Sequence, residues 1–216
     1  MTLPTSRGDR FRIETIDELV ETIGVPTGGI ELKVAPTIDE HARHFIERSP
    51  FIVLSTADAG GNVDASPKGD DVGFVAVADE RTILIPDRPG NKLAMGLRNV
   101  LVNPHVGVLF IVPGTNETVR INGRAELTRD PELLERMAAR GKPATLVLRV
   151  TVDECFFHCA KAIIRSHLWN ADTWPEKERI SFGVMYAERL GAVAAERDQI
   201  VTNVDTMVER DYCDNL

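Results

Sequence analysis

Residues 81–110, RTILIPDRPGNKLAMGLRNVLVNPHVGVLF, pass from strand to helix and back to strand within a short stretch of chain. The apolar, β-branched runs at residues 82–85 and 105–112 predict two strands. The pattern of residues 91–102 predicts a helix between them, and the following Asn-Pro pair ends it because proline cannot continue a helix. A charged turn at residues 87–92 joins the first strand to this helix.

Further strands are predicted on both sides of this stretch, from short apolar or alternating runs bounded by turn residues. They cover residues 51–57, 63–67, 74–78, 118–127 and 146–152, the last continuing towards residue 156. Most segments between these strands are too short for the crossover helices that parallel strands require. The chain is therefore predicted to be mainly β with flanking helices, its strands closing into an antiparallel barrel.

Two copies of the tetrapeptide Thr-Ile-Asp-Glu predict helix starts outside the barrel. At Thr15 and again at Thr37 the hydroxyl can cap a helix while the glutamate three residues later reaches back. Gly24 is expected to end the first helix, and the second is expected to end before residue 49. A third helix is predicted over residues 130–141, with aspartate as its cap and proline in its first turn.

No composition break or low-complexity linker divides the 216 residues, so a single domain is expected. In this interpretation residues 1–49 are an N-terminal helical extension, residues 50–158 the barrel core and residues 159–216 a C-terminal helical segment. The length is sufficient to bury a large core without disulfide bonds.

Composition excludes several classes of partner. Lysine and arginine number 25 against 33 aspartates and glutamates, a net charge of −8, which disfavours nucleic acid and anionic membranes. No apolar run approaches the roughly 20 residues of a membrane span, and the first residues have no apolar stretch typical of a secretory signal. The three cysteines form no CxxC motif, so reduced thiols and a cytoplasmic location are expected.

Metal and nucleophile chemistry are poorly supported by the sequence. Cys155, His158 and Cys159 lie close together, but a closed zinc site needs a second pair of ligands, which is missing. His41 and His44 share a predicted helix but have no companion carboxylate at a metal-site spacing. No G-x-S-x-G motif marks a serine nucleophile. We therefore predict no metal site.

The charged turn at residues 87–92 is the most informative segment for ligand binding. Pro89 and Gly90 shape the turn, and the free amides at the following helix start can face an anion. Arg88 and Lys92 add positive charge, and Asn91 adds a neutral donor, so a phosphate would gain charge-assisted hydrogen bonds. The segment matches neither the dinucleotide-binding nor the P-loop glycine pattern. The alternative is a solvated basic turn.

Three other segments add polar groups to the predicted barrel. Ser66 and Lys68 place a hydroxyl and an ammonium at the end of one strand, and Thr118 and Arg120 share one face of another. The alternative to ligand binding, for both pairs, is that these side chains lie on a sheet face exposed to solvent. In residues 155–169, CFFHCAKAIIRSHLW, a basic helix face ends in an indole, which suits a flat anionic ligand. An ordinary amphipathic helix with its tryptophan in the core would give the same pattern.

Together, residues 63–69 (VDASPKG), 81–110 and 117–126 (ETVRINGRAE) resemble the pyridoxamine 5′-phosphate oxidase-like proteins, which have the FMN-binding split-barrel fold. The resemblance covers residues 51–127 in good order. It extends to residue 169 in a less common subfamily, and membership of this subfamily implies no particular substrate. It implies a Greek-key split barrel and a homodimer with FMN at the subunit interface.

The resemblance also implies roles for individual residues. Lys92, helped by Asn91 and Arg88, would neutralise the FMN phosphate. Ser66, Lys68 and Thr118 would donate to ribityl or ring oxygens. The remaining implied contacts with the flavin, most of them supplied by the partner subunit, are Arg120, Lys161, Arg165, Ser166 and Trp169.

The function implied is that of an FMN-dependent oxidoreductase, in which the flavin transfers hydride or electrons to or from an unidentified small molecule. Phosphorylated vitamin B6 is not the expected substrate, because Arg165-Ser166-His167 lies too early for the family's Arg-x-His clamp and the C-terminus is acidic. No catalytic acid or base is singled out. A non-catalytic FMN carrier, or a deazaflavin- or haem-binding relative on the same fold, are the alternatives.

Overall fold

The computed structural model describes residues 11–90 and 92–215, and these contain one sheet of seven strands. The strands are β1 (Phe51–Ala57), β2 (Val63–Gly69), β3 (Ala76–Asp79), β4 (Thr82–Asp87), β5 (His105–Ile111), β6 (Thr118–Thr128) and β7 (Leu146–His158). Their order across the sheet is β2-β1-β5-β6-β7-β4-β3, and every neighbouring pair is antiparallel. The prediction of a mainly β, antiparallel fold with flanking helices is confirmed.

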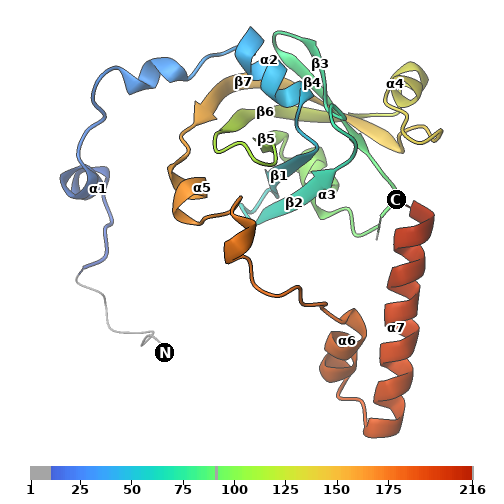
Figure 1. Ribbon diagram of the computed structural model, residues 1–216. Helices are drawn as coiled ribbons and strands as arrows, with labels where there is room; N and C mark the ends of the chain where they lie inside the picture. The colour runs from blue at the N-terminus through green and yellow to red at the C-terminus, as the bar shows by residue number, and fades with distance from the viewer. Residues whose placement is uncertain (1–10, 91, 216) are drawn as a thin grey trace.

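The sheet curls until β2 and β4 nearly meet (Figure 1). Four strands separate β2 from β4 in the sheet order, which in a flat sheet would place them about 24 Å apart. The Nζ atom of Lys68 in β2 nevertheless lies 2.7 Å from Oδ1 of Asp87 in β4. The barrel is thus split between these two strands, and we call this gap the seam.

Strand alternation builds the core inside the barrel. Every second residue of β1, β5 and β6 points inward, because side chains alternate across a strand. The most deeply buried of them are Ile52, Leu54, Val108, Phe110, Val119 and Ile121. β7 contributes Leu148, Val150 and Val152 to the same cluster. Each fully buried aliphatic or aromatic side chain contributes about 1.5–3 kcal/mol, so this interior is the main stabilising element of the fold.

Helices flank the barrel or extend from it (Figure 1). They are α1 (Ile16–Ile23), η1 (Ile30–Lys33), α2 (Glu40–Glu47), α3 (Met95–Val102), α4 (Pro131–Arg136), α5 (Lys161–Arg165), η2 (Ala171–Thr173), α6 (Phe182–Leu190) and α7 (Ala194–Asn215). α2 packs on β3, β6 and β7, and α3 packs on β1, β2 and β6. α6 and α7 form a hairpin that extends away from the sheet. No described helix combines the length and apolar character needed to cross a membrane.

The helix starts predicted from Thr-Ile-Asp-Glu have different outcomes. At Thr15 both capping-box hydrogen bonds are present, and Gly24 ends α1 as predicted. The prediction that Thr37 caps the second helix is wrong, since Oδ1 of Asp39 accepts from the amide of Ala42 at 2.7 Å. Ile38 is buried and its amide donates to Glu80, which holds the chain extended up to Asp39.

Two other helices are shorter than predicted, because residues within the predicted spans adopt positive φ angles. The helix predicted over residues 91–102 begins only at Met95, since Lys92 and Ala94 have φ of 62° and 52°. The helix predicted to continue to Gly141 ends at Arg136. Arg140 then takes a φ of 50° in a tight turn.

Candidate functional site

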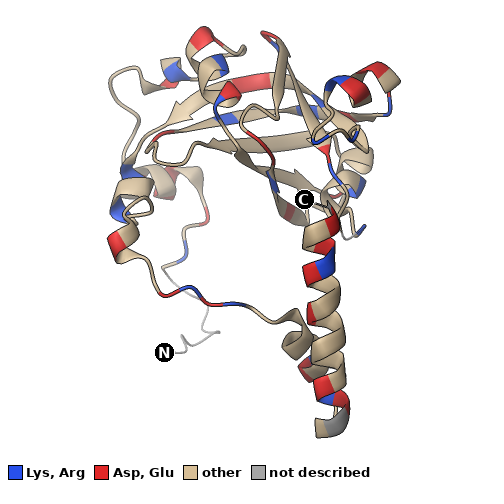
Figure 2. Ribbon diagram, turned by 45° about the vertical axis from the view of Figure 1, so that its right-hand side comes forward, with Lys and Arg blue, Asp and Glu red and all other residues tan. Residues whose placement is uncertain are grey.

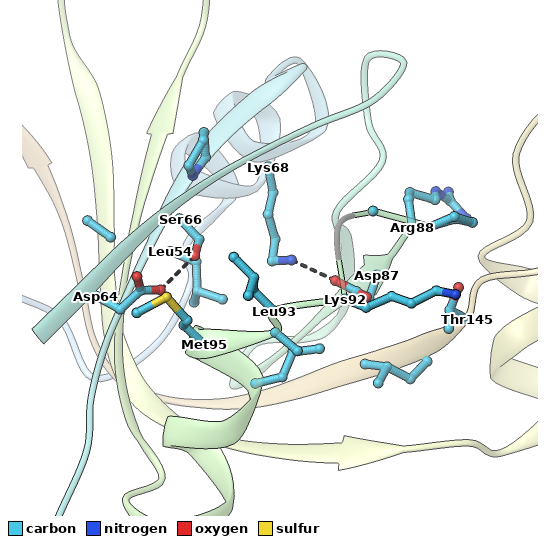
Figure 3. A pocket seen from close by; sticks show the side chains of 18 of the residues that line it. Leu54, Asp64, Ser66, Lys68, Asp87, Arg88, Lys92, Leu93, Met95 and Thr145 are labelled. Atoms are coloured by element: carbon cyan, nitrogen blue, oxygen red, sulfur yellow. Dashed lines mark hydrogen bonds and ion pairs between the residues drawn. The ribbon is translucent and has the colours of Figure 1, made fainter. Parts of the chain in front are cut away.

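A cavity of about 1090 Å³ lies at the seam, between β2 and the segment that joins β4 to α3 (Figure 3). Its charged and hydroxyl-bearing lining includes Asp64, Ser66, Lys68, Asp87, Arg88 and Lys92. Its apolar lining includes Leu54, Pro67, Leu93, Met95, Leu97 and Leu146. The cavity therefore offers both charged groups and an apolar wall to one ligand.

β2 supplies a row of polar side chains to the cavity. Asp64, Ser66 and Lys68 alternate along the strand and so share one face. The hydroxyl of Ser66 donates to Oδ2 of Asp64 at 2.7 Å, and Lys68 reaches across the seam to Asp87 (Figure 3). This row contains an acceptor, a hydroxyl and a cation at successive positions along the wall.

The charge of Arg88 is balanced by the protein. Its Nε donates to Oδ2 of Asp70 at 2.6 Å, and its Nη1 donates to the carbonyl of Met137 at 2.9 Å. Arg140 donates to the other oxygen of Asp70. Burial raises the pKa of Asp70, but the hydrogen bonds and charge of Arg88, the amide of Asp71 and the bond from Arg140 together lower it below the ordinary value. Arg88 is thus fixed in the turn as part of an ion pair.

Lys92 differs from the other two cations of the cavity. No ion pair or hydrogen bond joins its side chain to any other residue in the part of the chain that the structure describes, and it is exposed. Its φ of 62° is unusual for a residue other than glycine, and such strained positions cluster at ligand sites. Lys92 is therefore the cation with the most charge to offer an anion.

The start of α3 also lines the cavity. Ala94, the residue that precedes α3, makes no side-chain capping bond, so the first amides of the helix lack a capping acceptor. The first turn carries a partial positive charge, which attracts anions. A Cβ at Gly96 would lie 3.2 Å from Oδ2 of Asp64 and 3.5 Å from Oγ of Ser66, so glycine lets α3 pack closely on β2.

The structure brings together four of the eleven predicted site residues, namely Ser66, Lys68, Arg88 and Lys92. Asn91 lies outside the described residues. Thr118 and Arg120 lie on the outer face of β6 and do not line the cavity. Lys161, Arg165 and Ser166 are exposed on and after α5, and the indole of Trp169 donates to the carbonyl of Thr115 at 2.8 Å. This second group lies outside the seam cavity of the single chain.

Sequence reasoning missed the acidic residues of the site. Asp64 lies two positions before Ser66 on the same strand, so strand alternation could have identified it. Asp70 binds Arg88 from eighteen positions away, and no local pattern predicts that contact. Asp211, near the end of α7, also lines the cavity, and only the tertiary arrangement places it there.

The cysteine and histidine groups show no metal-binding arrangement. In residues 11–90 and 92–215 no three histidine, cysteine or acidic side chains could hold a metal ion together. Burial, with a smaller contribution from the charge of Asp39, raises the pKa of Cys155 to about 11. The Cys155 thiol therefore stays protonated at neutral pH and packs as a small core side chain.

The sequence of the chain matches one known protein family. The sequence profile of the pyridoxamine 5′-phosphate oxidase family matches residues 38–159, more than half of the chain. Solved structures that align with the chain include HupZ from Group A Streptococcus (17% identity, TM-score 0.46), General Stress Protein 26 from Bacillus anthracis (13%, 0.42) and an FMN-binding protein from Syntrophomonas wolfei (12%, 0.41). The alignments cover 56%, 53% and 54% of this chain and 93%, 88% and 88% of those chains. Among curated proteins no match was found.

Proposed function

Because the chain belongs to the pyridoxamine 5′-phosphate oxidase family, we propose that it is an FMN-dependent oxidoreductase whose flavin occupies the seam cavity. The observation that carries the proposal is the composition of this cavity. The lining combines the uncapped start of α3 and the cation of Lys92, which has no partner among the described residues, with a set of apolar side chains. A ligand with an anionic end and a flat apolar body matches that distribution.

The residues present fit FMN part by part. The phosphate matches Lys92 and the first amides of α3, which together supply charge-assisted hydrogen bonds. Ser66, Lys68 and Asp64 lie along one wall, where ribityl and ring polar atoms need donors and acceptors. Leu54, Leu97 and Leu146 belong to the apolar lining that the ring system needs.

The proposed role of Arg88 is to shape the region of the cavity that binds the phosphate. Since its Nε and Nη1 already donate to Asp70 and Met137, it holds the turn in place and adds positive potential. Lys68 has two proposed roles. It donates to the ligand, and its bond to Asp87 closes the seam next to the ligand. Bound FMN supplies hydride or electron transfer, and the residues named here bind and orient it and shield it from water.

We also propose a homodimer formed through the outer face of β2, β1 and β5. The outward residues of these strands include no lysine, arginine, aspartate or glutamate: they are Val63, Ala65, Pro67 and Gly69 of β2, Phe51, Val53, Ser55 and Ala57 of β1, and His105, Gly107, Leu109 and Ile111 of β5. Many of them are exposed, Val63 to 84%. An uncharged face can pair with its own copy about a two-fold axis without repulsion between like charges.

This dimer would complete the site. Thr118 lies on the outer face of β6, beside that uncharged surface, and the segment from Lys161 to Trp169 lies outside the cavity of its own chain. Lys161, Arg165, Ser166 and Trp169 are therefore proposed to contact the flavin of the partner subunit. Lys161 and Arg165 could there offset negative charge on the flavin ring.

Reconstitution with FMN tests the proposal. The purified chain should bind FMN with a visible absorbance band that bleaches anaerobically with NADH or NADPH and recovers in air. A flavin that binds but that neither donor reduces would indicate a carrier of FMN. A colourless protein that does not take up added FMN would refute both, and uptake of a deazaflavin or haem instead would indicate a different cofactor.

A further inference from the structure

A second group of cationic side chains lies on the outer face of the barrel, outside the seam cavity. The guanidinium carbon of Arg120 is 4.4 Å from the centroid of the Phe156 ring, and Nζ of Lys33 is 5.6 Å from the same centroid. The His158 ring lies beside Phe156, with 5.1 Å between centroids. Three groups that can carry positive charge thus surround one aromatic ring.

Sheet register assembles this group. Arg120 in β6 lies opposite Phe156 in β7, and Thr118 lies opposite His158. Residues that face each other across two strands share one side of the sheet. Val119, between the two β6 residues, points into the core and is fully buried. Thr118, Arg120, Phe156 and His158 therefore lie together on the outer face.

Lys33 reaches the same place from the N-terminal extension. It is the last residue of η1, and the chain after it is fixed to β7 by two backbone hydrogen bonds between Ala35 and Cys155, of 3.0 and 2.7 Å. This bridge places η1 beside Phe156. The arrangement is therefore produced by two segments that are distant in the sequence.

The group lacks a counter-ion. Nε of Arg120 is buried without a hydrogen-bond partner, and no hydrogen bond or ion pair involves the side chain of Arg120, Lys33 or His158 anywhere in the described chain. The carboxylates on the same strands are engaged elsewhere: Glu154 accepts from Asn122, and Asp153 pairs with Arg124. A guanidinium nitrogen that is buried without a partner is costly, and an anion would remove the cost.

Electrostatics at His158 agree with this description. Burial is the largest cause that lowers its pKa, followed by the charges of Arg120 and then Lys33. No carboxylate opposes them. The lowered pKa favours the neutral imidazole, whose single N–H can donate to a ligand.

We infer that Arg120, Lys33 and His158 form an anion site that takes the carboxylate or phosphate group of a small molecule, separate from the flavin cavity. The guanidinium of Arg120 lies over the Phe156 ring, and its terminal nitrogens can donate to the two oxygens of one anionic group. This inference does not depend on flavin binding.

Titration of the full-length protein with inorganic phosphate tests the site. The imidazole proton signals of His158 are followed by NMR and assigned by their loss in His158→Gln. Bound phosphate stabilises the charged imidazole, so a saturable rise in the pKa of His158 is expected. Arg120→Gln should weaken phosphate binding about tenfold or more, the usual effect of losing a charge-assisted hydrogen bond. Lys33→Gln, at an exposed position where folding is not at risk, should weaken it less.

Matched variants distinguish phosphate bound at this site from phosphate bound elsewhere on the protein. Arg124→Gln, on the same strand but already paired with Asp153, should leave the response unchanged. Lys92→Ala should also leave it unchanged, because phosphate in the seam cavity would not reach His158. Equal phosphate affinity in the Arg120 and Arg124 variants, or no saturable response in the unaltered protein, would overturn the inference. A His158 shift that follows protein concentration instead of phosphate would assign the group to carboxylates of a second copy and also overturn it.

Discussion

Lys92 is the residue on which the proposed phosphate contact depends most. It has no acidic partner among the described residues, whereas Lys68 and Arg88 are paired with Asp87 and Asp70. Lys92→Ala should therefore lower FMN affinity by about 1.5–3 kcal/mol, the usual value of a hydrogen bond to a charged group. Fluorescence titration of FMN measures the change. Lys177→Ala, at an exposed position before α6, is the control, and an unchanged affinity in Lys92→Ala would reject the phosphate assignment.

Asp70 holds the other end of the same turn. Its side chain is 1% exposed and accepts from both Arg88 and Arg140. Asp70→Asn should lower the free energy of unfolding by about 1–3 kcal/mol, because a partly buried guanidinium would lose its counter-charge. Urea unfolding at pH 7 measures this loss. Asp71→Asn alters a neighbour whose side chain is 87% exposed, and it should be nearly silent.

The pH dependence of this pair has a definite sign. The pKa of Asp70 is lowered in the folded protein, so the pair stabilises the fold above the unfolded-state value of about 3.9 and loses its effect as pH falls through the folded-state pKa. The difference in unfolding free energy between the unaltered protein and Asp70→Asn should stay constant from pH 7 to about 5 and shrink in more acidic solution. A difference that grew on acidification would contradict the lowered pKa.

Individual site residues were predictable only where their signal is local. Lys92 and Arg88 follow from a charged turn before a helix, and Ser66 and Lys68 from their position at the end of one strand. The partner of Arg88 was not predictable, because Asp70 meets it only after the sheet has curled. The sequence therefore pointed to three cations that line the cavity, Lys68, Arg88 and Lys92, but not to the aspartates that pair with two of them.

Among the elements, β6 contains the clearest steric constraint. The register with β7 shifts between Asn122 and Gly123, and a Cβ at Gly123 would clash with the backbone carbonyl of Thr151. Gly123→Ala should push the two strands apart and lower the free energy of unfolding by about 1–3 kcal/mol, as overpacking does. Denaturant unfolding measures the effect.

Gly107 in β5 provides the matched control for that substitution. A Cβ there would meet Oδ1 of Asn122 at 3.5 Å, which is an ordinary contact. Gly107→Ala should therefore change stability by less than about 0.5 kcal/mol. Equal losses in the two variants would mean that the loss of a glycine, and not the close approach to β7, determines the effect.

Strands were easier to predict than helices in this chain. The apolar runs of β1, β5 and β6 alternate for long enough to define their pairing face, and they lie within a residue of the predicted ends. The helix α3 was predicted to start too early and α4 to end too late, because Lys92, Ala94 and Arg140 adopt left-handed φ angles without being glycine. Tertiary contacts impose such angles, and residue type does not reveal them.

At the scale of the whole molecule, the net charge of −8 is unevenly distributed. Acidic side chains recur along α7, and basic ones lie on α5 (Figure 2). The cations at the seam are mostly paired with aspartates of the barrel. An acidic protein can thus offer an anion a local positive site, because the contribution of Lys92 and the start of α3 depends on short distances and not on total charge.

The proposed dimer gives the last prediction. Leu109 lies on β5, at the edge of the uncharged outer face, opposite Val53 of β1 and beside Arg120 of β6. A two-fold axis through this face would repeat any substitution on both subunits, so Leu109→Lys introduces two desolvated charges into one interface. Sedimentation equilibrium should give a mass of twice 23.8 kDa for the unaltered chain and a shift towards the monomer for the variant. Glu132→Lys, on α4 away from this face, should remain dimeric. A chain that is monomeric throughout would remove the basis for a flavin site shared between subunits, whereas FMN binding by such a monomer would leave the seam cavity as the complete site.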